Sequence, residues 1–182
     1  MPTVIIRPDG DSAVGNFSNT PIHAVLSDSN DATFTNNTTT NQTFIVTFDD
    51  VSLSGATFNS FALTVRAKKG GKGNATMNVR LADSSTVLSF ASLSVTSSSF
   101  TDFSAGAASF SSGYSDSDVN GINVRIDTTN NTQAFISEIF LTIDYTAAVS
   151  GYGHDVNSVG SSSIGKINSV ATASIGKVNS VD

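Results

Sequence analysis

The sequence predicts an all-β fold, an antiparallel two-sheet β-sandwich of the jelly-roll kind with an extended C-terminal repeat arm. Ser and Thr make up about a quarter of the 182 residues and are mixed with Val, Ile and Phe, a composition typical of strands. The acidic residues are fourteen Asp and a single Glu, Glu138, and Asp suits turns whereas Glu suits helices. Short stretches alternate apolar and polar residues between turn-rich segments, which is the pattern of half-buried strands.

Two strands are expected in the first forty residues. Residues 3–7 form an apolar run that Pro8-Asp9-Gly10 is expected to end. Residues 22–28 are a second candidate, and the polar stretch from Ser27 to Asp31 follows them. Residues 42–49 give a clearer strand signal.

The middle of the chain alternates most regularly. Within residues 58–68, Phe61, Leu63, Val65 and Ala67 share one face and Thr64, Arg66 and Lys68 the other. Residues 75–83 repeat the pattern, with Met77, Val79 and Leu81 inward and Asn78 and Arg80 outward. The intervening "KKGGKGN", residues 68–74, is interpreted as a hairpin loop.

Four more strands are expected before the domain ends, at residues 86–95, 101–105, 120–128 and 134–145. In residues 120–128, the apolar Ile122, Val124 and Ile126 alternate with Asn123, Arg125 and Asp127. In residues 134–145 one parity holds Phe135, Ile139, Leu141, Ile143 and Tyr145, interrupted only by Ser137. Eight or nine such strands predict two packed antiparallel sheets.

The alternation stops near Thr146, which predicts a domain over residues 1–146, a small-residue linker over 147–155 and an arm over 156–182. The arm carries repeats with a period of eleven residues. Its candidate docking residues are Val156, Asn157, Val159, Ile164, Lys166, Ile167, Asn168, Val170, Ile175, Lys177, Val178, Asn179 and Val181. The arm has too few apolar atoms to fold by itself, and we therefore expect it to become ordered when it docks on a partner.

Composition excludes several function classes. There is no cysteine, hence no disulfide scaffold, thiolate metal site or cysteine nucleophile. The net charge of −6 and the pI near 4.6 argue against general nucleic-acid binding. No secretory signal is expected at the start, and no apolar run is long enough to span a membrane.

No catalytic motif is present, so we expect no enzyme activity and no cofactor. His23 and His154 lack any accompanying signature. The carboxylates in the loops are expected to stabilise turns. The alternative is a calcium site, with Asp28, Asp31, Asp116 and Asp118 as candidate ligands. The loop at residues 68–74 lacks the spacing of a phosphate-binding loop.

The Ser/Thr/Asn-rich sandwich, closing on "EIFLTIDY", resembles accessory structural domains of tailed-bacteriophage virions. "SIGKINSV" and "SIGKVNSV" resemble short repeats at the ends of some phage structural proteins. The resemblance implies a non-enzymatic virion component, a capsid decoration or a tail or fibre part, assembled in the host cytoplasm. Its partners would be other virion proteins or copies of itself, reached through the repeated arm by avidity.

Two other functions stay open. A host-surface carbohydrate-binding module would be favoured by loop aromatics gathered in a shallow cleft, although the chain has no Trp and only three Tyr as stacking platforms. A subunit of a self-assembling extracellular filament would be favoured by an arm that inserts into the next subunit. Clustered acids in a deep pocket would point instead to an enzyme.

Overall fold

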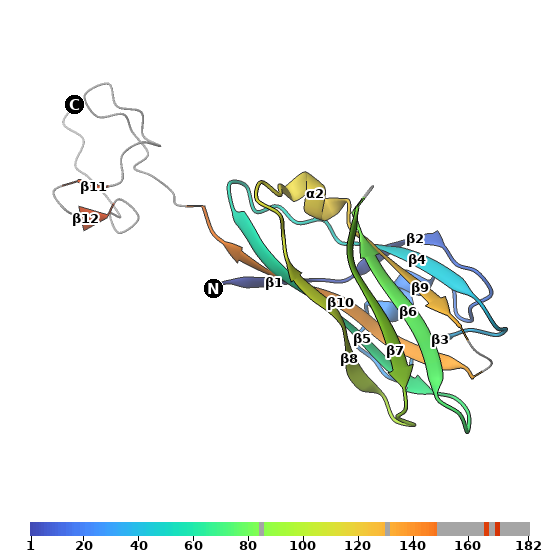
Figure 1. Cartoon of the computed structure of the whole chain (residues 1–182). Helices are drawn as coiled ribbons and strands as arrows, with labels where there is room; N and C mark the ends of the chain where they lie inside the picture. The colour runs from blue at the N-terminus through green and yellow to red at the C-terminus, as the bar shows by residue number, and fades with distance from the viewer. Residues whose placement is uncertain (84–85, 130–131, 149–165, 168–169, 172–182) are drawn as a thin grey trace. The chain divides into compact units, whose positions relative to one another are not determined.

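The computed structural model describes residues 1–83, 86–129, 132–148, 166–167 and 170–171. The chain divides into two units, Met1–Thr146 and Ala147–Asp182. The first unit consists of two antiparallel five-stranded sheets (Figure 1). The predicted two-sheet β-sandwich is therefore confirmed.

We call the two sheets A and B. Sheet A has the order β1 (Thr3–Ile6), β10 (Ala134–Thr146), β5 (Thr57–Lys69) and β8 (Thr101–Ser109), and β3 (Thr35–Asn36) also pairs with β10. Sheet B has the order β2 (Pro8–Ala13), β4 (Thr43–Phe48), β9 (Asn123–Thr128), β6 (Ala75–Ala82) and β7 (Val87–Val95). The chain crosses repeatedly from one sheet to the other, so neighbours in a sheet come from distant parts of the sequence.

The inward faces of both sheets form one hydrophobic core. Leu63 and Val65 of β5 are fully buried, as are Val79 and Leu81 of β6. Full burial of such a side chain contributes roughly 1.5–3 kcal/mol to folding. The inward parities predicted for residues 58–68, 75–83 and 120–128 are confirmed, which fixes the outward parity of the polar residues between them.

The predicted strand at residues 22–28 is wrong, because Ile22–Leu26 forms a short helix, α1. Ile22 and Leu26 are four residues apart and both fully buried, so a helical turn points them together into the core. The helix has no side-chain cap of its own. Asp11 of β2 supplies one, because its carboxylate accepts the backbone N–H groups of Ile22 and His23, both at 2.8 Å.

Three further expectations need correction. Residues 68–74 do not close a hairpin, since β5 lies in sheet A and β6 in sheet B. The first strand, β1, ends at Ile6 as expected, but Pro8-Asp9-Gly10 is not a turn, because it opens β2, which pairs with β4. A register shift between Ile136 and Glu138 of β10 changes the parity, so that Ile136 is fully buried and Phe135 is only half-buried.

A second short helix, α2 (Asp116–Asn120), precedes β9 and begins at a capping box between Ser115 and Asp118. In the second unit, β11 (Lys166–Ile167) pairs antiparallel with β12 (Val170–Ala171). Among the described residues, no helix has the length and apolar character needed to cross a membrane.

Candidate functional site

Phe90 stands out among the aromatic residues because its ring lies in solvent. It is 63% exposed, and none of the other eleven phenylalanines, all within the described part of the chain, is classed as exposed. Phe90 belongs to β7 and shares its parity with Ser92 and Ser94, which point away from the core. An exposed ring forgoes roughly 1.5–3 kcal/mol of burial and is available as a stacking platform, so its neighbours on the sheet decide whether it marks a site.

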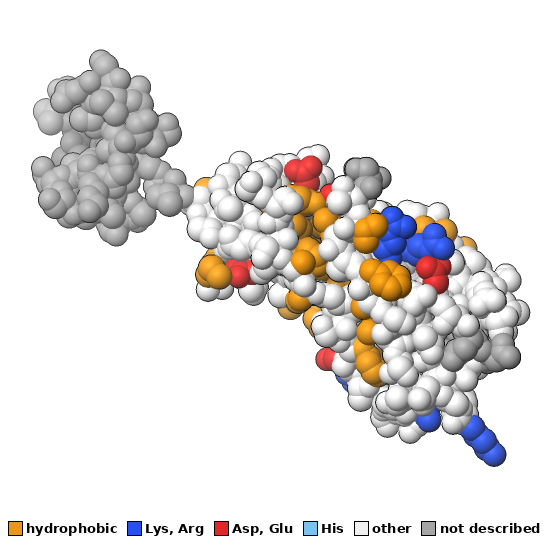
Figure 2. Space-filling view, in the orientation of Figure 1, with side chains coloured by type: hydrophobic (Ala, Val, Ile, Leu, Met, Phe, Trp, Pro, Cys, Tyr) orange, Lys and Arg blue, Asp and Glu red, His pale blue; other side chains and the backbone are white. Residues whose placement is uncertain are grey.

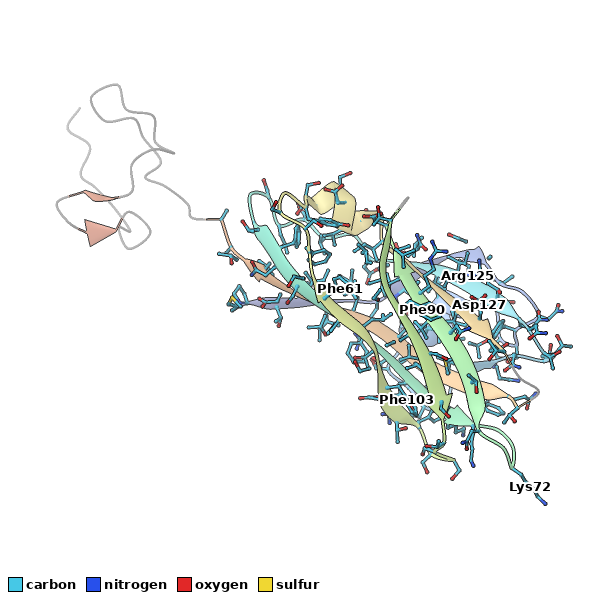
Figure 3. The ribbon with its side chains drawn as sticks, in the orientation of Figure 1. Phe61, Lys72, Phe90, Phe103, Arg125 and Asp127 are labelled. Carbon is cyan, nitrogen blue, oxygen red and sulfur yellow. The ribbon has the colours of Figure 1, made fainter. Side chains whose placement is uncertain are left out.

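A row of side chains runs from Phe90 across the outer face of sheet B. Phe90 is in register with Arg80 of β6, and Arg80 is in register with Arg125 of β9. Arg125 in turn is in register with Ile45 of β4. Figure 2 shows hydrophobic, basic and acidic side chains together on this side of the molecule, and Figure 3 labels Phe90, Arg125 and Asp127 there.

The next row of the same face is polar. Ser92 of β7 is in register with Asn78 of β6, Asn78 with Asp127 of β9, and Asp127 with Thr43 of β4. Hydroxyl, amide and carboxylate groups therefore lie beside the exposed ring. We call the surface made by Phe90, Arg80, Arg125, Asn78, Asp127, Ser92 and Thr43 the Phe90 face.

Arg125 and Asp127 form a fixed ion pair on the Phe90 face. Arg125 Nε donates to both carboxylate oxygens of Asp127, at 2.9 and 3.0 Å, and Nη2 lies 2.9 Å from Oδ1. Thr43 Oγ1 donates to the same Oδ1. Burial acts to raise the pKa of Asp127, but the hydrogen bonds from Arg125 and Thr43 and the nearby arginine charges lower it below its usual value. Asp127 is therefore ionised at neutral pH.

A second aromatic group lies on the outer side of sheet A, but its rings are already covered. Phe34, Phe100 and Phe135 are half-buried and pack on one another with centroid separations of 5.0–6.1 Å. Lys68 Nζ sits 4.4 Å from the centroid of the Phe100 ring and within 5.7 Å of the other two. The protein's own lysine occupies the place a ligand would need.

Two hollows lie elsewhere on the domain. One, of about 440 Å³, is lined by residues 37–40, 70–72 and 132–133 and has no aromatic lining. The other, of about 390 Å³, lies over β5, β8 and β10 and is lined mainly by small residues, together with Phe61 and Asp144. Phe61 is only 3% exposed, so neither of these two hollows offers an exposed aromatic ring beside charged groups as the Phe90 face does.

The four candidate calcium ligands already make protein contacts. Asp28 accepts the N–H of Asn30 at 2.9 Å, and Asp31 holds Arg66 through two hydrogen bonds of 2.8 and 2.7 Å. Asp116 accepts the N–H of Leu53 at 2.9 Å, and Asp118 closes the capping box of α2. The described residues include no cluster of three or more His, Asp or Glu side chains suited to a metal ion. The absence of a cofactor stays a prediction, with calcium as its alternative.

The two histidines differ in what can be said of them. His23 lies in α1, and its Nδ1 is 3.1 Å from Asp11 Oδ1. His154 lies outside the described residues.

Of the thirteen docking residues, only Lys166, Ile167 and Val170 fall in described strands, where Lys166 is in register with Ala171 and Ile167 with Val170. The remaining ten, which are Val156, Asn157, Val159, Ile164, Asn168, Ile175, Lys177, Val178, Asn179 and Val181, lie outside the described residues.

Sequence reasoning placed Asn78, Arg80, Arg125 and Asp127 on outward positions but did not single out Phe90. A signal was present, because Ala91, Leu93 and Val95 form the apolar parity of this strand and Phe90 falls on the serine parity. Nothing in the sequence indicated that Arg80 and Arg125 are in register. Alternation predicts which side of the sheet a residue faces, but it does not predict which strand lies next to it.

No protein-family model and no curated protein sequence matches the chain. Solved structures with a similar arrangement include a CBM35 from Cellvibrio japonicus Abf62, at 12% identity and a TM-score of 0.46, covering 81% of this chain and 99% of that one. Another contains the CBM22-1 and GH10 modules of Clostridium thermocellum xylanase 10B in complex with xylohexaose. Its identity is 13% and its TM-score 0.44, and the match covers 87% of this chain and 30% of that one. A third is the CBM32 of AlyQ in complex with 4,5-unsaturated mannuronic acid, at 15% identity and a TM-score of 0.38, covering 76% of this chain and 97% of that one.

The prediction of a phage structural protein, whether capsid decoration, tail or fibre component, is wrong. The solved structures reported above are carbohydrate-binding modules, alone or joined to enzyme modules, and not phage structural proteins. The Ser/Thr-rich β-sandwich that carried the resemblance is a feature of composition and fold, which unrelated functions share.

Proposed function

We propose that the protein is a glycan-binding module without catalytic activity of its own and that it binds through the Phe90 face. The observation that carries the proposal is the exposed ring of Phe90 beside Arg80, next to a row of polar side chains on the outer face of sheet B. Sugar rings have an apolar face of C–H groups and an equatorial rim of hydroxyls. A flat aromatic platform bordered by hydrogen-bonding groups matches both.

The Phe90 face supplies the two kinds of contact from neighbouring strands. Adjacent strands lie about 4.8 Å apart, so a ring stacked on Phe90 brings its edge substituents over β6. Asn78 and Ser92 lie one row along, where amide and hydroxyl groups can exchange hydrogen bonds with sugar hydroxyls. The open face accommodates an extended polymer, whereas a deep pocket would accept only a chain end.

Three carboxylates of the domain, Asp31, Asp118 and Asp127, are unsuited to the role of the catalytic acid in glycoside hydrolysis. A catalytic acid needs a raised pKa so that it holds a proton near neutral pH. A hydrogen bond from Arg66 lowers the pKa of Asp31, and hydrogen bonds from Ser115 lower that of Asp118. The pKa of Asp127 is lowered as well. These groups are ionised where a general acid must be protonated.

Replacing Phe90 by Ala tests the proposal. Stacking contributes about 0.5–1.5 kcal/mol beyond the buried area, so Phe90→Ala is expected to weaken binding to the preferred polysaccharide about tenfold or more. Affinity electrophoresis against a panel of neutral and acidic polysaccharides identifies that polymer, and calorimetry measures the change in Kd.

Ile5→Ala is the matched control. Ile5 is 53% exposed on β1 of sheet A, so this variant also removes an exposed apolar side chain but leaves the Phe90 face intact. Both variants should keep the native melting temperature. Glycan binding that is unchanged in Phe90→Ala, or lost equally in Ile5→Ala, would place the site elsewhere. Failure of the native protein to bind any polysaccharide in the panel would remove the proposal.

A further inference from the structure

We infer that the ligand of the Phe90 face is an acidic glycan, with Arg80 binding the carboxylate of a uronic acid residue. The inference rests on the proposed glycan-binding function and adds the chemical class of the sugar. It is carried by the arrangement of charges around Phe90.

The first step is the placement of two like charges side by side. Arg80 and Arg125 are in register on adjacent antiparallel strands, where directly opposed side chains have Cβ atoms about 4.5–5.5 Å apart. Like charges in this position destabilise a sheet. The charge of Arg80 offsets part of this cost, because it helps to lower the pKa of Asp127. The carboxylate of Asp127 is hydrogen-bonded to Arg125, however, so a binding role explains the second arginine better than a structural one.

The second step is that only one of the two arginines is neutralised. Arg125 donates hydrogen bonds to Asp127, which raise the pKa of Arg125 above its usual value, and Asp127 also accepts a hydrogen bond from Thr43. Within the residues that the structure describes, the guanidinium of Arg80 has no hydrogen bond or ion pair. The face therefore presents one uncompensated positive charge, on a protein whose net charge is −6.

The third step is the geometry of recognition. A guanidinium presents a planar fork of N–H donors that matches a carboxylate, and this match favours a carboxylate over a tetrahedral sulfate ester. Arg80 lies one strand from Phe90, directly across the β6–β7 pair. A pyranose stacked on Phe90 with an equatorial carboxylate on its rim would bring that carboxylate to Arg80.

Two forms of one polymer provide the test. Polygalacturonate carries a carboxylate on each sugar, and its fully methyl-esterified form has the same backbone without the charge. We expect calorimetry to show binding of the acid form at least about tenfold tighter than of the ester, because a charge-assisted hydrogen-bond pair is lost with esterification. Raised salt should weaken binding of the acid form, since Arg80 is exposed.

Variants of Arg80 separate the guanidinium from the charge. Arg80→Gln should remove the preference for the acid form, and Arg80→Lys should retain only part of it, because the ammonium lacks the planar fork. Arg80→Gln removes the repulsion from Arg125 and also the attraction to Asp127, two opposed effects, so the melting temperature should stay close to the native value. Loss of binding in a folded Arg80→Gln variant is therefore not a folding effect. Ile5→Ala again serves as the control that keeps the native preference.

The outcomes separate this inference from the proposed function. Equal binding of the acid and ester forms, or binding only of neutral polysaccharides, overturns the acidic-glycan inference and leaves the glycan-binding proposal standing. Equally tight binding of dextran sulfate that depends on Arg80 overturns the choice of a carboxylate. Tighter binding of single-stranded poly-dT than of any glycan overturns both proposals, as does the absence of binding to every polymer tested.

Discussion

At the scale of single residues, exposure and charge balance separate the Phe90 face from the rest of the surface. Two arginines on sheet A are paired within the protein: Arg66 is held by Asp31 and Asp102, and Arg7 by Glu138. On the Phe90 face the Arg125–Asp127 pair is closed in the same way, but Phe90 and Arg80 remain open to solvent. A binding site keeps its strongest groups unsatisfied until the ligand arrives.

The Asp31–Arg66 pair predicts a pH dependence of stability. The hydrogen bond from Arg66 lowers the pKa of Asp31 below its ordinary value of 3.8, so below about pH 4 the unfolded chain binds more protons at this group than the folded one. Its contribution to stability is complete above that pH and is lost as the pH falls through the folded pKa. Melting curves between pH 3 and 6 should show that the melting temperatures of the native protein and Asp31→Asn approach each other as the pH falls to 3. A constant difference in melting temperature would contradict the assignment.

At the scale of elements, α1 shows how a contact between distant residues sets local structure. Ile22 and Leu26 fill the core only from a helical turn, and the cap for that turn comes from Asp11 on β2. A strand was predicted for this segment because the apolar residues of a five-residue helix satisfy a strand pattern as well. The cap could not be found from the local sequence, since Asp11 lies eleven residues upstream of Ile22.

Asp11→Ala is expected to lower the free energy of unfolding by about 2 kcal/mol, because two backbone N–H groups lose their acceptor. Asp11→Asn keeps one acceptor oxygen and should lose less. Urea denaturation measures both. Asp9→Ala on the same strand removes only an exposed hydrogen bond to Thr47 and is the control, with an expected change within about 0.5 kcal/mol. Equal losses for Asp9→Ala and Asp11→Ala would show that the Asp11 contacts do not cap the helix.

The strands themselves were largely predictable. The segments that became β4, β5, β6, β7, β9 and β10 alternate over enough residues to predict a strand, and for β5, β6 and β9 the alternation also predicted the inward face correctly. Alternation failed where the backbone departs from it, at the bulge between Ile136 and Glu138. It also misassigned residues 68–74, because a short glycine-rich loop suits a hairpin and a crossing between sheets equally well.

At the scale of the whole molecule, the candidate site exists only because of topology. Phe90, Arg80 and Arg125 come from β7, β6 and β9, and the last is separated in sequence from the other two by β8 and α2. The sequence predicted that Arg80 and Arg125 point outward, and it could not predict that they share one row. Composition did not point to the candidate site for the same reason, since counts of Trp and Tyr say nothing about where a single Phe lies.

The central claim is that glycan binds the Phe90 face, and a chemical-shift titration of the labelled protein with oligogalacturonate tests it most directly. We expect the largest backbone and side-chain shifts at Phe90, Arg80, Asn78 and Ser92, with smaller ones at Arg125. Shifts confined to residues 37–40, 70–72 and 132–133 would move the site to the polar hollow there. A titration that shifts no residue of sheet B would contradict the account.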